Sequence, residues 1–229
     1  MRRTAQIPFD LPATASLARD DLVSGEANAL ALGAIDAWPD WPHPVVMVVG
    51  PPGAGKTHIA AAWAERAGAA MFDPASANAA GERSDGGFAV VVEDIDRTGY
   101  DEGELFSLFN AARLGGGSVL ATSRLMPAAL PIRLPDLLSR LRAATIVELA
   151  APDETLLFGV LMKLAADRQV ELDPRLATFA LSRMERSFEA AADLIGRLDR
   201  EALARKGPIT RSLLQSVLRQ MEVECDTAS

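Results

Sequence analysis

The sequence predicts an α/β fold in which a P-loop nucleotide-binding domain with a parallel sheet precedes a small all-helical domain. Short β-branched runs alternate with helical segments as far as Ala150, and only helical segments follow from there to Met221. A glycine-rich turn, GPPGAGKT (50–57), joins one such run to an alanine-rich stretch. Strands that alternate with helices are typical of a parallel sheet covered by helices. We therefore divide the chain into a tail (1–16), an α/β domain (17–150) and a helical domain (151–225).

Continuous β-branched runs predict strands that are buried on both faces of the sheet. Four runs have this character: 45–50, 88–96, 118–124 and 145–150. An extended entry and a helix are predicted over 21–37, and the three prolines of WPDWPHP (38–44) predict a loop. Further helices of this domain are expected after Thr57, at 104–116 and at 134–144.

Four helices are predicted in the C-terminal part, at 153–169, 174–184, 186–205 and 210–222. Asp153, the pair Asp173-Pro174 and Thr210 are typical helix-start residues, and Gly207-Pro208 separates the last two helices.

Composition narrows the classes of function. The formal net charge is −8, with 23 basic and 31 acidic residues, whereas nucleic-acid affinity comes largely from basic residues that contact phosphates. We therefore expect no autonomous DNA binding. The single cysteine, Cys225, cannot form an internal disulfide, which suits a reducing cytoplasm. No apolar run approaches the roughly 18 residues of a membrane span, and no signal-peptide pattern follows Arg2 and Arg3. We expect a cytoplasmic protein without membrane contact.

GPPGAGKT fills every required position of the motif G-x-x-x-x-G-K-[ST], between a predicted strand and a predicted helix. Glycines let backbone N–H groups surround phosphates, the lysine reaches the β- and γ-phosphates, and the threonine hydroxyl ligates Mg²⁺. The segment therefore predicts binding of a nucleoside phosphate with Mg²⁺, and the cofactor that we expect is ADP or ATP. The predicted contacts are Gly50, Pro51, Gly53, Ala54, Gly55, Lys56, Thr57 and His58.

The run FAVVVEDID (88–96) ends in carboxylates, which in P-loop proteins belong beside the metal. Because side chains alternate along a strand, Glu93 and Asp94 should point to opposite sides and hold different roles. We expect Glu93 to face the metal together with Thr57, Asp94 to orient the attacking water, and Asp96 to cap a turn or helix. A solvated acidic strand end is the alternative interpretation.

Three further features accompany the P-loop. Thr122 and Ser123 end the third predicted strand, Arg140 lies in the short helix LPDLLSRL, and RSFEAAA (186–192) lies in the helical part. Together with LVSGEANALA (22–31), this order resembles the AAA+ ATPase module of the bacterial replication initiator DnaA over roughly residues 20–222.

The resemblance implies a five-stranded AAA+ P-loop domain with a helical lid. Leu22 and Val23 would form part of the adenine pocket, and Thr122 would be a polar sensor. Arg140 would match the arginine finger that reaches a neighbouring subunit's nucleotide; a surface charge is the alternative. Arg186 would match the lid's sensor arginine, although a second register of RSFEAAA puts Glu189 there. The family's acidic strand usually ends in Asp, so Glu93 is a departure that argues against fast hydrolysis.

DnaA carries a C-terminal helix-turn-helix DNA-binding domain, and this sequence has no segment that we expect to supply one. A DnaA-like module without that domain, preceded by a short peptide, resembles the Hda family. That resemblance implies docking on the DNA polymerase sliding clamp and stimulation of hydrolysis of DnaA-bound ATP, a negative regulation of replication initiation in the bacterial cytoplasm. It makes DnaA a partner, and a homodimer is also compatible with it.

The family's clamp-binding peptide has the form Gln-Leu-x-Leu-Pro-Leu. QIPFDL (6–11) matches it through Gln6, Ile7, Phe9 and Leu11, while Asp10 stands where proline is frequent. Such a peptide buries large apolar side chains in a preformed pocket, with a polar anchor to set the register. The alternative is that these side chains pack on their own domain or add an edge strand.

Two other functions stay open at this point. The chain could be a DnaA-related adaptor or loader that recruits another replication protein, with nucleotide as a structural switch. It could also be an autonomous ATPase, which would require appreciable turnover by the isolated protein. A slow ATPase that activates its partner's hydrolysis is the interpretation that we expect.

Overall fold

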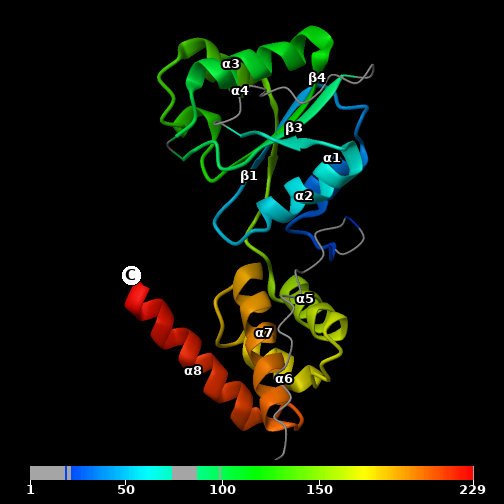
Figure 1. The fold of residues 1–229 in the computed structure, drawn as a ribbon, viewed down its shortest axis with the longest axis vertical. Helices are drawn as coiled ribbons and strands as arrows, with labels where there is room; N and C mark the ends of the chain where they lie inside the picture. Colours follow the sequence, from blue (N-terminus) through cyan, green and yellow to red (C-terminus); the bar gives the residue numbers. More distant parts are fainter. Residues whose placement is uncertain (1–18, 20–21, 74–86, 98, 229) are drawn as a thin grey trace, which may run out of the picture.

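The computed structural model describes residues 19, 22–73, 87–97 and 99–228, with side chains as far as residue 224. The predicted clamp-binding peptide, Gln6 to Leu11, therefore lies outside the described residues. Figure 1 shows a sheet with helices on both sides in one half of the molecule and a group of helices in the other half.

Five parallel strands form one sheet in the order β2-β3-β4-β1-β5. They are β1 (Val45–Val49), β2 (Ala70–Met71), β3 (Phe88–Val92), β4 (Gly117–Ser123) and β5 (Thr145–Glu148). The predicted α/β fold with its parallel sheet is confirmed. Strand β2 escaped the sequence pattern because two residues are too short to show a period. Parallel strands end at the same edge, so the turns after β1, β3 and β4 meet there.

Alternate residues of the central strands pack on the two faces of the sheet. Helices α1 (Ala29–Asp36) and α2 (Lys56–Ala67) cover the face that carries Val46, Val48 and Leu120. Helices α3 (Glu102–Ala111) and α4 (Pro135–Ala143) cover the opposite face. A π-helical turn (Ala112–Gly116) joins α3 to β4, and a 3-10 turn (Pro127–Ala129) precedes α4. Helices therefore cover both faces of the sheet, and the turns after β1, β3 and β4 lie together at one edge.

The proline-rich loop 38–44 packs on the back of α2. The ring of Trp41 stacks on Trp63 at 5.1 Å between centroids, and Trp38 meets the same ring edge-on at 6.4 Å. The indole rings of Trp38 and Trp41 therefore pack within the domain.

Helices α5 (Glu154–Asp167), α6 (Pro174–Leu181), α7 (Phe188–Arg205) and α8 (Arg211–Ala228) enclose a separate apolar core; we call residues 154–228 the lid. The side chains of Asp153, Asp173 and Ser187 accept hydrogen bonds from N–H groups in the first turns of α5, α6 and α7. Nη2 of Arg197 in α7 forms an ion pair with Oε2 of Glu224 in α8, at 2.6 Å. In the described part of the chain, no helix combines the length and the apolarity needed to span a membrane.

Candidate nucleotide-binding site

A cavity of about 420 Å³ lies where the P-loop, the segment 22–28 and the lid helices α5 and α7 meet. Most of the predicted nucleotide contacts line it, namely Leu22, Val23, Gly53, Ala54, Gly55, Lys56, Thr57 and His58. Gly50 and Pro51 take part through their carbonyl groups, which bind the side chain of Lys56. The residues that sequence reasoning assigned to the nucleotide are thus brought together around one cavity.

Two glycines of the P-loop have left-handed backbone angles, with φ of 71° at Gly53 and 89° at Gly55. Side chains there would also collide with the lid. A Cβ on Gly53 would lie 2.5 Å from the Cβ of Ser187, and one on Gly55 would lie 3.0 Å from the ring of Phe188. This geometry keeps the loop backbone free of side chains, as a site for phosphate groups requires.

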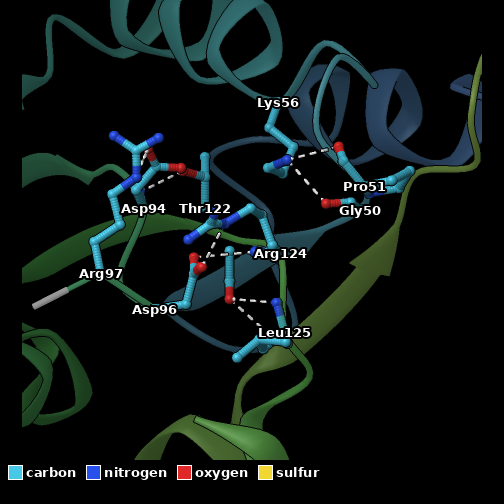
Figure 2. A network of polar contacts seen from close by, with 10 residues as sticks. Gly50, Pro51, Lys56, Asp94, Asp96, Arg97, Thr122, Arg124 and Leu125 are labelled. Carbon is cyan, nitrogen blue, oxygen red and sulfur yellow. Dashed lines mark hydrogen bonds and ion pairs between the residues drawn. The ribbon is translucent and has the colours of Figure 1, made fainter. Parts of the chain in front are cut away.

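Lys56 is the first residue of α2 and is almost completely buried. Its ammonium group donates hydrogen bonds of 2.8 Å to the carbonyl oxygens of Gly50 and Pro51 (Figure 2). Burial lowers the pKa of Lys56 below its ordinary value, and the charges of Asp94 and Asp96 oppose this shift only in part. The site thus holds a cation that is partly stripped of water, which suits an anionic ligand. The cavity, the glycine backbone and this cation together fit a nucleoside phosphate.

The acidic turn after β3 (residues 93–97) differs from the prediction. Strict alternation holds only for extended residues, whereas β3 ends at Val92 and Asp94 has a φ of 49°. Of the two acids, Asp94 lines the cavity and Glu93 is absent from its lining. The carboxylate of Asp94 pairs with Arg97 at 3.1 Å. The structure therefore puts Asp94 on the cavity that Lys56 lines, and the assignment of the metal to Glu93 stays a prediction.

Glu93 has different contacts from those of Asp94. Its main-chain carbonyl accepts a hydrogen bond from the hydroxyl of Tyr100, and its Oε1 is buried without a hydrogen-bond partner. Two acids in sequence thus have different surroundings, as expected.

Thr122, the predicted sensor, is 1% exposed, and its hydroxyl accepts a hydrogen bond of 2.9 Å from the main-chain N–H of Asp94. This contact supports the acidic turn from the neighbouring strand β4. The hydroxyl of Ser123 instead bonds within its own turn, to the main-chain N–H and carbonyl of Leu125.

The segment 22–28 closes the cavity opposite the P-loop. Leu22 and Val23 line it together with Val160 and Leu164 of α5. Such an apolar wall suits a planar base. The side chain of Asn28 holds the segment in shape, because its Oδ1 accepts from the N–H of Gly25 and its Nδ2 donates to the carbonyl of Val23. Sequence reasoning missed Asn28, although asparagine just ahead of an alanine-rich helix is a recognisable turn signal.

The lid presents an acid to the cavity where a sensor arginine was expected. Glu189 lines the cavity, whereas Arg186 is outside the lining and its guanidinium is 3.9 Å from the carboxylate of Glu154. Helix α7 begins at Phe188, so Arg186 precedes the helix and Glu189 lies in its first turn. The structure favours the second register of RSFEAAA. The lid's basic group on the cavity is Lys163 of α5, which pairs with Asp167 at 2.8 Å.

Arg140 lies on α4, outside the lining of the cavity. Its guanidinium donates a hydrogen bond of 3.3 Å to Oδ1 of Asn110, and its Cζ is 6.0 Å from the ring centroid of Phe106. Both partners belong to α3, so the two helices hold this arginine between them. Arg140 thus lies away from the chain's own nucleotide cavity, and its assignment as an arginine finger stays a prediction.

The fold and the cavity define a P-loop protein with the AAA+ fold. Domain III of DnaA from Thermotoga maritima superposes with a TM-score of 0.74 at 16% identity, over 89% of this chain and 96% of that domain. DnaA from Aquifex aeolicus bound to AMPPCP gives 0.64 at 22% identity, over 83% of this chain and 68% of that one. RuvB from Thermotoga maritima gives 0.69 at 18% identity, over 90% and 73%.

In sequence, the chain is 28% identical to an uncharacterized protein of Haemophilus influenzae over 208 residues, which span 85% of this chain and 90% of that protein. No protein-family model matches the chain. These likenesses show the fold, and the chemistry has to be argued from the residues themselves.

Proposed function

We propose that this protein is a nucleotide-binding AAA+ regulator of the Hda type, which promotes hydrolysis of ATP bound to DnaA while docked on the sliding clamp. One observation carries the proposal. The chain combines a P-loop cavity of its own with an arginine, Arg140, that lies outside that cavity and is held between two helices.

The chain's own residues suit ADP or ATP with Mg²⁺. The P-loop backbone from Gly53 to Gly55 would hold the phosphates, Lys56 would neutralise their charge, and Thr57 would supply a hydroxyl ligand for the metal. Asp94 would complete the metal's surroundings or orient water, with Glu93 as the sequence-based candidate for the metal. Bound Mg²⁺ supplies charge neutralisation for phosphoryl transfer.

The lid argues for slow hydrolysis by the chain itself. Glu189 brings negative charge to the cavity in the place where a sensor arginine would bring positive charge. Catalysis is then best completed on the partner's nucleotide, because an arginine finger supplied in trans accelerates phosphoryl transfer by about 10³–10⁵-fold.

The decisive experiment compares Arg140→Ala with Arg142→Ala, an exposed arginine of the same helix. We expect Arg140→Ala to keep ADP affinity within about twofold and to lose at least about tenfold of the stimulation of DnaA's ATPase. Arg142→Ala should keep both. Unchanged stimulation by the Arg140→Ala protein would reject the mechanism in trans.

The clamp contact rests on the peptide Gln6–Leu11 alone and needs a separate test. Pull-down of the full-length protein on immobilised clamp should fail for the double variant Gln6→Ala/Phe9→Ala and succeed for Thr14→Ala in the same tail. Undiminished capture of the double variant, combined with DnaA binding, would favour the adaptor or loader function instead.

A further inference from the structure

Two charged residues of the site have no role in the mechanism so far. Arg124 follows β4 and lines the cavity, and Asp96 lies in the acidic turn behind it. They come from loops 28 residues apart in sequence that the sheet order β3-β4 brings together. Sequence reasoning treated Asp96 as a cap and did not single out Arg124.

Both carboxylate oxygens of Asp96 accept hydrogen bonds from Arg124. Its Oδ2 accepts a hydrogen bond of 2.7 Å from Nε of Arg124, and its Oδ1 accepts one of 3.0 Å from the main-chain N–H (Figure 2). The side chain of Asp96 is 1% exposed, whereas that of Arg124 is 42% exposed. A buried carboxylate that binds both Nε and the backbone leaves the arginine little freedom to rotate. Arg124 itself lines the cavity.

The turn that carries Arg124 is fixed from two sides. Ser123 is completely buried, and its hydroxyl bonds to both the N–H and the carbonyl of Leu125, at 2.9 and 2.7 Å. The main-chain N–H of Gly50, the first P-loop residue, donates to the carbonyl of Ser123 at 3.1 Å. Arg124 is therefore held in register with the P-loop as well as with the acidic turn.

The surroundings of Arg124 are those of the phosphate-binding end. Lys56, Thr57 and Asp94 line the same cavity. Burial chiefly lowers the pKa of Lys56, and the positive charge of Arg124 lowers it further. Two like charges facing one cavity, one of them braced by a buried acid, form a ready site for a polyanion.

We propose that Arg124 contacts the terminal phosphate of a nucleoside triphosphate bound in its own subunit, and that Asp96 is the positioning residue that holds it there. The inference rests on the proposed nucleotide binding and adds a specificity to it. A diphosphate lacks the group that Arg124 reaches, so Arg124 contributes to binding of the triphosphate alone. Arg124, held by Asp96, is then the residue that detects the third phosphate. Thr122 has a structural role, because its hydroxyl binds the main-chain N–H of Asp94 in the neighbouring turn.

The test measures dissociation constants of the full-length protein for ADP and for AMPPCP, each with Mg²⁺, by titration calorimetry. We expect Arg124→Gln to weaken AMPPCP by about tenfold or more and to leave ADP within about twofold, since a hydrogen bond to a charged group is lost only with the triphosphate. Arg113→Gln, an exposed arginine of the π-helical turn, is the matched control and should change neither value.

Asp96 needs a variant that preserves shape. Asp96→Asn should weaken AMPPCP by about threefold to tenfold with little effect on ADP, because Arg124 keeps its charge but loses its brace. Arg124→Lys keeps a charge beside Asp96 without the forked donors, so it should recover only part of the AMPPCP affinity. A structural role alone would move the thermal midpoint of both variants and leave the ratio of the two dissociation constants unchanged.

The outcomes separate the two proposals. Equal loss for ADP and AMPPCP, or no loss for either, overturns the assignment of Arg124 while nucleotide binding stands. Failure of the wild-type protein to bind both nucleotides overturns the proposed function and this inference with it. If Arg124→Gln does not fold, the same comparison on Arg124→Lys decides, because that variant retains the ion pair with Asp96.

Discussion

The main-chain N–H of Phe188, the first residue of α7, donates a hydrogen bond of 3.2 Å to the carbonyl oxygen of Gly53 in the P-loop. The lid therefore rests directly on the loop that would hold the phosphates. Ser187 and the ring of Phe188 occupy the space that side chains on Gly53 and Gly55 would need. The P-loop backbone and the start of α7 are thus in direct contact.

Gly53→Ala should destabilise the protein by about 1–3 kcal/mol, because it adds left-handed strain and a clash with Ser187. Chemical denaturation measures the change. Gly33→Ala in α1 is the control, since nothing lies within 4 Å of its added Cβ. That change should instead stabilise the protein by about 0.5–1 kcal/mol. Equal effects of both substitutions would contradict a lid seated on the P-loop.

Lys56 should make nucleotide affinity depend on pH in the alkaline range. Burial lowers the pKa of Lys56 below 10.5, and the ammonium must be charged to hold phosphate, so ADP affinity should fall as the pH rises through this lowered pKa. At pH values between the lowered pKa of the folded protein and 10.5, Lys56 is protonated in the unfolded chain and deprotonated in the folded protein. The contribution of Lys56 to the free energy of unfolding therefore rises with pH over that interval.

Dissociation constants for ADP between pH 7 and 10 check this prediction. Lys56→Arg should remove the alkaline decline, because arginine stays charged throughout the range. Lys56→Gln should bind weakly at every pH. A wild-type profile as flat as that of Lys56→Arg would show that the ammonium of Lys56 does not titrate in the range where the site is tested.

Asn110→Ala should loosen Arg140 and lower stimulation of the partner's ATPase several-fold, because a hydrogen bond that orients the guanidinium is lost. ADP affinity should stay unchanged, since neither residue lines the cavity. Measuring both quantities in the Arg140→Ala background gives the necessary comparison. If Asn110→Ala reduces stimulation there as well, Asn110 acts independently of Arg140.

Glu189→Gln should strengthen nucleotide binding by about twofold to tenfold, because it removes a negative charge from the cavity in which we propose that phosphates bind. Arg186→Gln should leave affinity within about twofold, since Arg186 is exposed and lies outside the lining. Calorimetry with ADP distinguishes them. A large loss for Arg186→Gln together with no gain for Glu189→Gln would restore Arg186 as the lid's sensor.

The parts of the fold that depend on local pattern could be predicted from the sequence. Four β-branched runs predict strands of the sheet, and the spacing of GPPGAGKT predicts the P-loop between a strand and a helix. Strand β2, with two residues, carries no pattern to recognise.

Two side-chain directions depend on local geometry that the sequence pattern does not carry. Strand β3 ends at Val92 and Asp94 turns the chain, so period-2 alternation does not decide where Glu93 points, and its assignment to the metal stays a prediction. The register of RSFEAAA depended on where α7 begins, which the cap at Ser187 decides. The pairing of Asp96 with Arg124 depends on strand order, and residues 28 positions apart leave no trace of it in the sequence.

The cluster of Trp38, Trp41 and Trp63 has a practical consequence. These are the three tryptophans of the chain, and Trp38 and Trp41 both pack on Trp63 of α2. Trp63 lies two turns along the helix that begins at Lys56. A shift of that helix when phosphate reaches Lys56 would alter the stacking of Trp63 on Trp41, and hence the ultraviolet emission of the protein. Intrinsic tryptophan emission, measured with and without nucleotide, would then report on the P-loop without any added label.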